Sequence, residues 1–232
     1  EGEFVAEDLI KEEQTVVALT HFGYIKRMPI DTYRSQRRGG KGITGIATRE
    51  EDFVKQIFTA STHDTILFFS NKGKLYKLKG YEVPEAGRTA KGTAIVNLLS
   101  LDPGEKISAV IPIQNFAEGK YLLMATKNGL IKKTALTEYN SSRTTGLQGI
   151  TLKDDDELIT VRLTDGEDNV VLVTREGMCI TFDEKDVRPI GRVAQGVIGI
   201  RLSDEDEVIG MESVIAGGKA TLLAITENGF GK

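Results

Sequence analysis

Five segments of the chain share one template, and this repeat constrains the fold more than any other feature of the sequence. Each segment has four apolar residues, a Ser or Thr, two further residues and a Gly. The template glycines are Gly23, Gly73, Gly129, Gly177 and Gly229, at spacings of 50, 56, 48 and 52 residues. The pattern predicts a strand that enters a tight hairpin, because glycine at the end of a short loop can adopt a left-handed backbone.

Two further landmarks follow the first four templates in the same order. About 20 residues on, an Arg precedes a Gly-containing stretch, and these arginines are Arg38, Arg88, Arg143 and Arg192. A third strand is expected after each, at 45–47, 94–96, 149–151 and 199–201. A solvated acidic turn and a fourth strand follow, at 51–54, 105–107, 157–159 and 207–209. Each unit therefore contains four short strands.

A period of about 50 residues with four strands per unit is typical of propeller-like, all-β architectures. We expect four complete blades at roughly 14–63, 64–118, 119–167 and 168–218, and the start of a fifth at 219–232. Residues 1–13 form an acidic lead-in, in which Glu7 to Glu13 could make one helical turn. The truncated fifth unit and the absence of an initial Met indicate a fragment of a larger protein.

Composition excludes several classes of protein. Apolar residues make up 40% of the 232 residues and charged residues 28%, which is typical of a folded, non-membrane chain. The single cysteine, Cys179, excludes an internal disulfide framework, favours a cytoplasmic location and is expected to be half-buried in a strand. One cysteine and two histidines leave little for a metal site, and no cluster of acids, bases or nucleophiles indicates catalysis.

The net charge of −4 hides an uneven distribution of charge. Residues 1–13 carry six acids and one Lys, or −5, whereas 24–42 carry six bases and one acid, or +5. Residues 72–91 carry six bases and two acids, or +4, and 127–143 carry four bases and one acid, or +3. The bases recur in the hairpin after the template Gly and in the following loop, most strongly in the first repeat and least in the fourth, where 175–192 carry four bases and four acids. They predict a basic rim that runs around the blades, with the acidic turns on another edge.

A long basic rim fits a polyanion such as duplex DNA, which carries one charge per ~1.7 Å of its axis. The chain has no Trp and shows no recognition helix, which disfavours single-strand stacking and base readout. The predicted rim contacts, in addition to the loop described next, are Lys26, Arg27, Arg34, Lys72, Lys74, Lys77, Arg88, Lys91, Lys127, Lys132, Lys133, Arg143 and Arg192.

The densest basic segment is Gln36-Arg37-Arg38-Gly39-Gly40-Lys41-Gly42, whose backbone N–H groups and side chains can both reach phosphates. In the first of several β repeats, this string resembles the gyrase A box. Together with THFGYIKRMP, TKNGLIKKT and TENGFGK, it makes the whole chain similar to the C-terminal domain of the A subunit of bacterial DNA gyrase.

The resemblance implies a six-bladed β-pinwheel, in which neighbouring blades exchange strands. It also implies non-catalytic wrapping of double-stranded DNA around the perimeter with a positive crossing, for which Gln36 to Gly42 are required. The catalytic part of gyrase A, and gyrase B, are the implied partners in an ATP-dependent topoisomerase of the bacterial cytoplasm and nucleoid, and both would lie outside this chain. No cofactor is expected within it.

Two alternatives remain open at this point. The related C-terminal domain of the topoisomerase IV subunit has a degraded or missing box, so an intact QRRGGKG favours gyrase. A propeller scaffold that binds protein partners is the other alternative, motivated by the acidic turns and the negative net charge.

Overall fold

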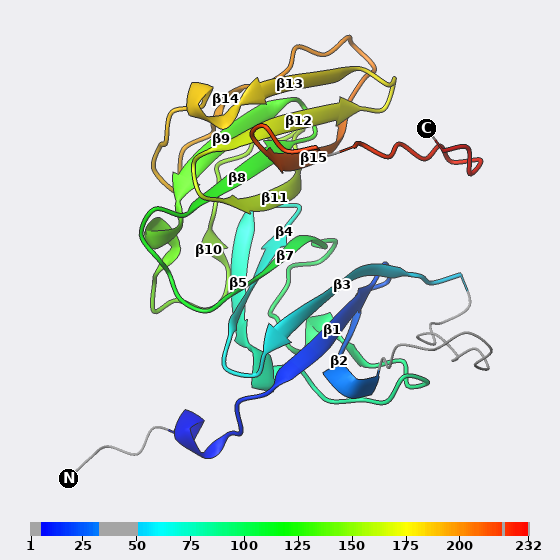
Figure 1. Ribbon diagram of the computed structural model, residues 1–232, viewed down its shortest axis with the longest axis vertical. Helices are drawn as coiled ribbons and strands as arrows, with labels where there is room; N and C mark the ends of the chain where they lie inside the picture. Colours follow the sequence, from blue (N-terminus) through cyan, green and yellow to red (C-terminus); the bar gives the residue numbers. More distant parts are fainter. Residues whose placement is uncertain (1–5, 33–50, 220, 232) are drawn as a thin grey trace.

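The computed structural model describes residues 6–32, 51–219 and 221–231, and these form four small antiparallel sheets (Figure 1). The all-β, propeller-like prediction is confirmed. The described residues contain no α-helix, only short 3-10 turns, of which η1 (Ala6–Leu9) lies in the acidic lead-in. Within these residues, no helix is long and apolar enough to cross a membrane.

Each of the first three sheets takes strands from two consecutive repeats. In the first sheet the order is β3 (Val54–Ser61), β1 (Gln14–Thr20), β2 (Tyr24–Pro29) and β6 (Thr93–Ala94). The second is β7 (Ile107–Ile113), β4 (Thr65–Ser70), β5 (Lys74–Lys79) and β10 (Leu147–Gln148). The third is β11 (Leu158–Thr164), β8 (Tyr121–Thr126), β9 (Leu130–Ala135) and β14 (Val197–Ile198). The last strand of each sheet comes from the following repeat, which is the strand exchange of a pinwheel.

The third strand expected at 45–47 lies outside the described residues. Those expected at 94–96, 149–151 and 199–201 begin one or two residues earlier than predicted, are only two residues long and belong to the preceding sheet. Each pairs over two residues only, as Tyr24 with Ala94 and Ile25 with Thr93. The fourth sheet has three strands among the described residues: β15 (Val208–Ile215), β12 (Asp168–Thr174) and β13 (Cys179–Asp183). Because β13 has no further partner there, Cys179 is exposed, and the prediction of a half-buried cysteine is wrong.

The template predicts the hairpins correctly. All five template glycines have a positive φ, between 74° and 89°. In each turn the Gly N–H bonds to the carbonyl of the preceding Ser or Thr, as Gly129 does to Thr126 at 3.1 Å. The hydroxyl of the same residue accepts the next N–H, as Thr126 does from Leu130 at 3.1 Å. The Ser or Thr is needed because it satisfies a second donor in the turn.

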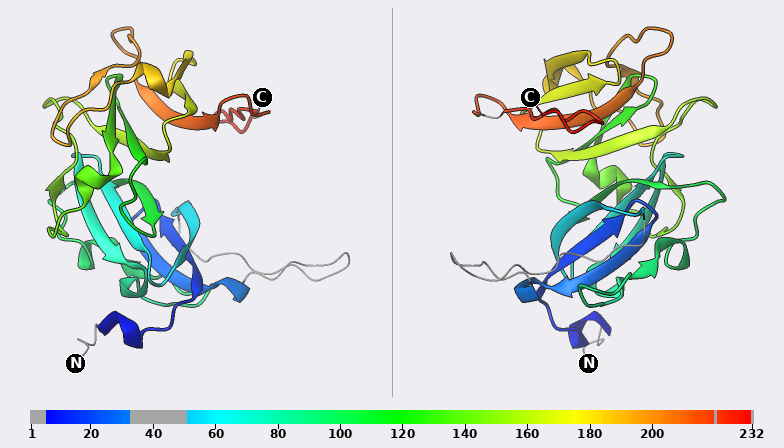
Figure 2. Two further views of the ribbon diagram at one scale, coloured as in Figure 1. Left: turned by 60° about the vertical axis from the view of Figure 1, so that its left-hand side comes forward. Right: turned by 90° about the vertical axis from the view of Figure 1, so that its right-hand side faces the viewer.

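The apolar runs are continuous because the central strands are buried on both faces. In β4, Ile66 and Phe68 pack toward the first sheet, whereas Leu67 and Phe69 pack toward the third. A strand covered on only one face would alternate apolar and polar residues. Successive sheets therefore share cores. The sheets follow one another along the long axis of the molecule (Figure 2).

The inner edges of the sheets contact one another, so the exchanged strands lie on the outside. Strand β11 contacts both β7 and β15. The Ser108 hydroxyl donates to the carbonyl of Leu158 at 2.8 Å, and the guanidinium of Arg162 pairs with Glu212 at 2.7 Å. Strands β6, β10 and β14 and the loops that precede them therefore form the perimeter.

One 3-10 turn follows the second strand in each of the four repeats, and the sequence pattern did not predict these turns. They are η2 (Ile30–Thr32), η3 (Gly80–Glu82), η5 (Leu136–Tyr139) and η6 (Glu184–Asp186), and η4 (Ile95–Asn97) is an additional turn in the second repeat. The lead-in contacts the first two sheets: Thr62, which follows β3, donates its N–H to the carbonyl of Glu13 at 2.9 Å, and Lys79 at the end of β5 pairs with Glu7 at 3.2 Å.

The glycines of equivalent turns allow the contact between consecutive repeats to be measured separately from turn strain. A Cβ at Gly129 would lie 2.6 Å from the carbonyl oxygen of Ile200, whereas one at Gly177 would meet nothing within 4 Å. Both have a similar φ, 89° and 84°. We expect Gly177→Ala to lose roughly 1–2 kcal/mol of unfolding free energy from backbone strain. Gly129→Ala should lose about 1–3 kcal/mol more from overpacking. Urea unfolding of both variants measures the difference, and equal losses would contradict the packing described for Gly129.

Candidate nucleic-acid interface

Three perimeter loops, at 83–92, 137–146 and 187–196, each lie against the second strand of the preceding repeat. Arg27 N–H bonds to the carbonyl of Pro84 at 3.0 Å, and Lys77 N–H bonds to that of Thr144 at 2.8 Å. Ile190 N–H bonds to the carbonyl of Lys133 at 2.9 Å. Each loop is thus fixed to a neighbouring blade by main-chain bonds.

These loops present four of the predicted rim residues. Lys91 and Arg143 are exposed, and Arg88 and Arg192 are partly exposed. The Arg143 guanidinium donates to the carbonyl of Thr145 at 2.8 Å, which holds it within its own loop. Arg34 and the segment Gln36 to Gly42 lie outside the described residues.

Four other predicted rim residues are buried, so the prediction that they line the rim is wrong. The exposed fraction is 2% for Lys26, 8% for Lys77, 0% for Lys132 and 4% for Lys133. Each Nζ donates to main-chain carbonyls of the following repeat, as Lys77 does to Tyr139 at 2.7 Å and Ser141 at 2.9 Å. Lys133 also pairs with buried Glu184 at 3.5 Å. These contacts keep the charges satisfied without water.

The remaining predicted rim residues are paired, some with the acidic turns. Lys74 pairs with Asp102 at 2.6 Å and Lys127 with Glu207 at 3.5 Å. Exposed Lys72 donates to the carbonyl of Pro103 at 3.3 Å, and Arg27 pairs with Glu85 at 3.6 Å. The prediction that the acidic turns lie on a separate edge is therefore wrong for Lys72, Lys74 and Lys127.

The acidic turns pack inward because one carboxylate in each of three repeats caps the neighbouring hairpin. Asp52 accepts from the N–H groups of Phe22 and Phe53, at 3.0 and 2.9 Å. Asp156 and Asp206 make the equivalent bonds in the third and fourth repeats. Burial acts to raise the pKa of Asp52, but hydrogen bonds from the Thr20 side chain and these two N–H groups outweigh it, and the pKa is lowered.

Lys132 has the most perturbed ammonium group. Burial, aided by the positive charge of Arg192 and opposed by Glu138, lowers the pKa of Lys132 from 10.5 to about 7. Its Nζ donates to the carbonyl of Gly149 at 2.6 Å and to that of Arg192, and it lies 5.9 Å from the Tyr139 ring centroid. The group therefore titrates near neutral pH at the base of a perimeter loop.

Sequence reasoning missed two kinds of residue. Arg188 lies exposed in the loop 187–196, and its position before the loop glycines was the available signal. The second kind is a cluster of three carboxylates, from Asp165, Asp168 and Glu184. One oxygen of each lies within 4.8 Å of the others, an arrangement that could hold a cation. The Glu184 carboxylate already accepts from Thr164 Oγ1 at 2.8 Å and Asp168 N–H at 2.7 Å. These bonds give the cluster a structural role.

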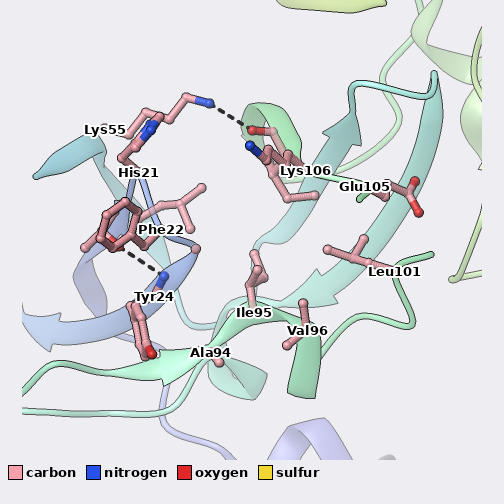
Figure 3. A pocket seen from close by; sticks show the side chains of 14 residues that line it. His21, Phe22, Tyr24, Lys55, Ala94, Ile95, Val96, Leu101, Glu105 and Lys106 are labelled. Carbon is pink, nitrogen blue, oxygen red and sulfur yellow. Dashed lines mark hydrogen bonds between the residues drawn. The ribbon is translucent and has the colours of Figure 1, made fainter. Parts of the chain in front are cut away.

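A groove of 540 Å³ lies between the first two sheets (Figure 3). Ile95 and Val96 line it between His21 and Phe22 on one side and Leu101 on the other. Phe22 and Val96 are 53% and 61% exposed, which leaves apolar surface uncovered. Lys55 and Lys106 also line the groove, and Lys55 Nζ donates to the carbonyl of Ile107 at 3.0 Å.

The repeats match a known family. Residues 14–61, 64–114, 120–165 and 168–215 match the family described as "DNA gyrase C-terminal domain, beta-propeller". The chain belongs to the DNA gyrase C-terminal domain family. The four matched segments correspond to the four repeats that build the sheets.

Curated relatives agree with this assignment. The chain is 57% identical to the A subunit of DNA gyrase from Clostridium acetobutylicum over 199 residues, which is 86% of this chain and 24% of the relative. It is 48% identical to the A subunit of DNA gyrase from Staphylococcus aureus over 227 residues, or 97% of this chain and 26% of the relative. The chain thus spans about a quarter of the length of these relatives.

Solved structures share the architecture. The C-terminal domain of DNA topoisomerase IV aligns with a TM-score of 0.75 and 32% identity, over 90% of this chain and 63% of that one. A DNA gyrase A C-terminal domain aligns with a TM-score of 0.73 and 30% identity, over 94% and 70%. The E. coli ParC C-terminal domain, at 17% identity over 88% and 80% of the two chains, aligns with a TM-score of 0.67 and shares the fold.

The titration of Lys132 is directly measurable. An NMR pH titration of the lysine side chains should show one transition near pH 7 that Lys132→Met removes. Between pH 7 and 10.5 the unfolded chain binds the proton that folded Lys132 has released. The unfolding free energy of the wild type, relative to Lys132→Met, should therefore rise with pH across this window. Absence of the transition near pH 7 would contradict the burial of this group.

Proposed function

We propose that this chain binds double-stranded DNA along its perimeter and wraps it, largely without sequence specificity. The observation that carries the proposal is the recurrence of a basic loop on the outer side of successive blades, at Arg88 with Lys91, at Arg143 and at Arg188 with Arg192. Contacts repeated at one position per blade suit the evenly charged backbone of a duplex. The absence of an α-helix among the described residues supports backbone contact rather than readout in the major groove.

The segment Gln36 to Gly42 is proposed as the principal DNA contact. It is the first repeat's counterpart of the loops at 83–92, 137–146 and 187–196, and it is denser in cations than any of them. These three loops lie against the second strand of the preceding repeat, on the perimeter, which supports placing the first loop at the perimeter as well.

Gyrase is favoured over topoisomerase IV as the parent enzyme. The relatives at 48% and 57% identity are gyrase A proteins, and the QRRGGKG string is intact. A positive wrap would then let the holoenzyme introduce negative supercoils in the cytoplasm, at the nucleoid. DNA cleavage and ATP hydrolysis would belong to the catalytic part of gyrase A and to gyrase B, with no catalytic residue or cofactor supplied by this domain.

The proposal is tested by replacing Arg37, Arg38 and Lys41 with Ala. The affinity of the wild-type chain for linear duplex DNA should fall steeply with salt, with a slope of about 0.9 per phosphate contact. The triple variant should lose the linking-number change in a relaxation-and-ligation assay and keep residual binding through Arg88, Lys91 and Arg143. A wild-type shift in topology from the variant would refute the proposed role of this segment.

A protein-binding scaffold is the second candidate function, favoured by the exposed groove beside Phe22. Absent or salt-independent DNA binding by the wild-type chain would support it. Phe22→Ser is then the variant of choice, because it removes a large exposed apolar side chain of the groove without changing a charge. Under the DNA-wrapping proposal, Phe22→Ser should bind duplex DNA as the wild type does.

A further inference from the structure

We propose that Lys26 and Lys132 are positioning residues, each of which holds a perimeter loop in place. Lys26 turns the backbone N–H of Thr89 outward, and Lys132 turns that of Val193 outward. Each N–H then lies beside basic side chains and binds a phosphate oxygen. The proposal rests on the proposed DNA-binding function and deepens it. It assigns to two buried lysines a part in recognition that involves no contact with DNA.

Lys26 gathers the carbonyls of the loop 83–92. Its Nζ lies 3.0 Å from the carbonyl oxygen of Gly87, 2.8 Å from that of Arg88 and 2.6 Å from that of Ala90. Three acceptors use all three N–H groups of an ammonium. Lys26 is only 2% exposed, so these carbonyls point into the protein.

The geometry of the peptide bond then fixes the direction of the following N–H groups. Within a trans peptide unit the C=O and N–H bonds point in opposite directions, and the described residues contain no cis peptide. Because the Arg88 carbonyl points inward, the N–H of Thr89 points outward. The same reasoning turns the N–H of Lys91 outward. Outward N–H groups that lie close together in a turn, as at Thr89 and Lys91, form a concavity suited to anions.

Lys132 makes a similar contact two repeats further along the chain, with one carbonyl of the loop 187–196 and one of Gly149 in its own repeat. Both lysines lie three residues after a template glycine, Gly23 or Gly129. The Lys132 Nζ donates to the carbonyl of Arg192, so the N–H of Val193 faces outward. Both loops also end at a glycine that lies against the main chain of the preceding second strand. A Cβ at Gly92 or Gly196 would lie 2.5 or 2.6 Å from the carbonyl of Ile25 or Ile131, respectively.

The second repeat shows that the lysine accompanies this loop geometry. The second repeat has Tyr76 at the position, and its hydroxyl donates to Glu105 at 2.9 Å. There, neighbouring Lys77 anchors the following loop instead.

The decisive experiment is a double-mutant cycle on duplex-DNA affinity, with Lys26→Met and the pair Arg88→Ala with Lys91→Ala. We expect Lys26→Met alone to weaken binding by roughly tenfold, within the range for residues in one hydrogen-bonded network. In the Arg88→Ala, Lys91→Ala background it should have little further effect. A matched control combines Lys26→Met with Arg192→Ala on another blade, where the two losses should add.

The salt slope separates positioning from direct contact. If Lys26 bound a phosphate itself, Lys26→Met would lower the slope by about 0.9 in either background. If it positions the loop, the slope should fall in the wild-type background and stay unchanged in the Arg88→Ala, Lys91→Ala background. An additive cycle, or a loss of slope in both backgrounds, would overturn the proposal.

A second pair of variants tests the amide itself. Thr89→Pro removes the N–H, whereas Thr89→Ala keeps it. We expect Thr89→Pro to weaken binding as much as Lys26→Met and Thr89→Ala to bind as the wild type does; equal binding by both would overturn the proposal. If Lys26→Met fails to fold by circular dichroism, Lys26→Gln replaces it. Failure of the wild-type chain to bind duplex DNA would instead refute the proposed function.

Discussion

Each blade depends on parts that the following repeat supplies. The outer strand β6 and the loop 83–92 both come from the second repeat but complete the first sheet, and β14 with the loop 187–196 does the same for the third. A single repeat therefore cannot finish its own sheet, and its loop is placed by its neighbour. The position of a basic residue in space is consequently set by contacts between repeats rather than within one.

This sharing explains why lysines occur inside the protein. The central strands are covered on both faces, so the second strands carry side chains that face an incoming loop rather than water. The loop contains several carbonyls that its own N–H groups do not reach, and the lysine ammonium donates hydrogen bonds to them. Tyr139, whose hydroxyl donates to the Gly149 carbonyl at 3.0 Å, has a similar function with a neutral group.

The sequence was sufficient for the repeat, the blade architecture and the hairpins, because each depends on local chemistry. Glycine at a positive φ and a Ser or Thr that caps the turn are recognisable over eight residues, as at Thr126 and Gly129. The roles of the strand lysines were not predictable, because the carbonyls that pair with Lys26 lie 61 to 64 residues away. The inward turn of Asp52, which pairs with Phe22 30 residues earlier, was missed for the same reason.

The perimeter exposes fewer cations than the count of basic residues along the chain predicts. Four of its predicted lysines are internal, and Arg27, Lys74 and Lys127 are paired with acids. Under the proposed wrapping function, fewer contacts must then offset the energy of bending DNA, of order 1–6 kcal/mol for a 20–30 bp site. A long exposed side chain loses up to about 2 kcal/mol of conformational entropy when it is fixed on a phosphate. A backbone N–H already held in place by a buried lysine loses much less, so a rim with few exposed cations can still hold a bent duplex if its loops are rigid.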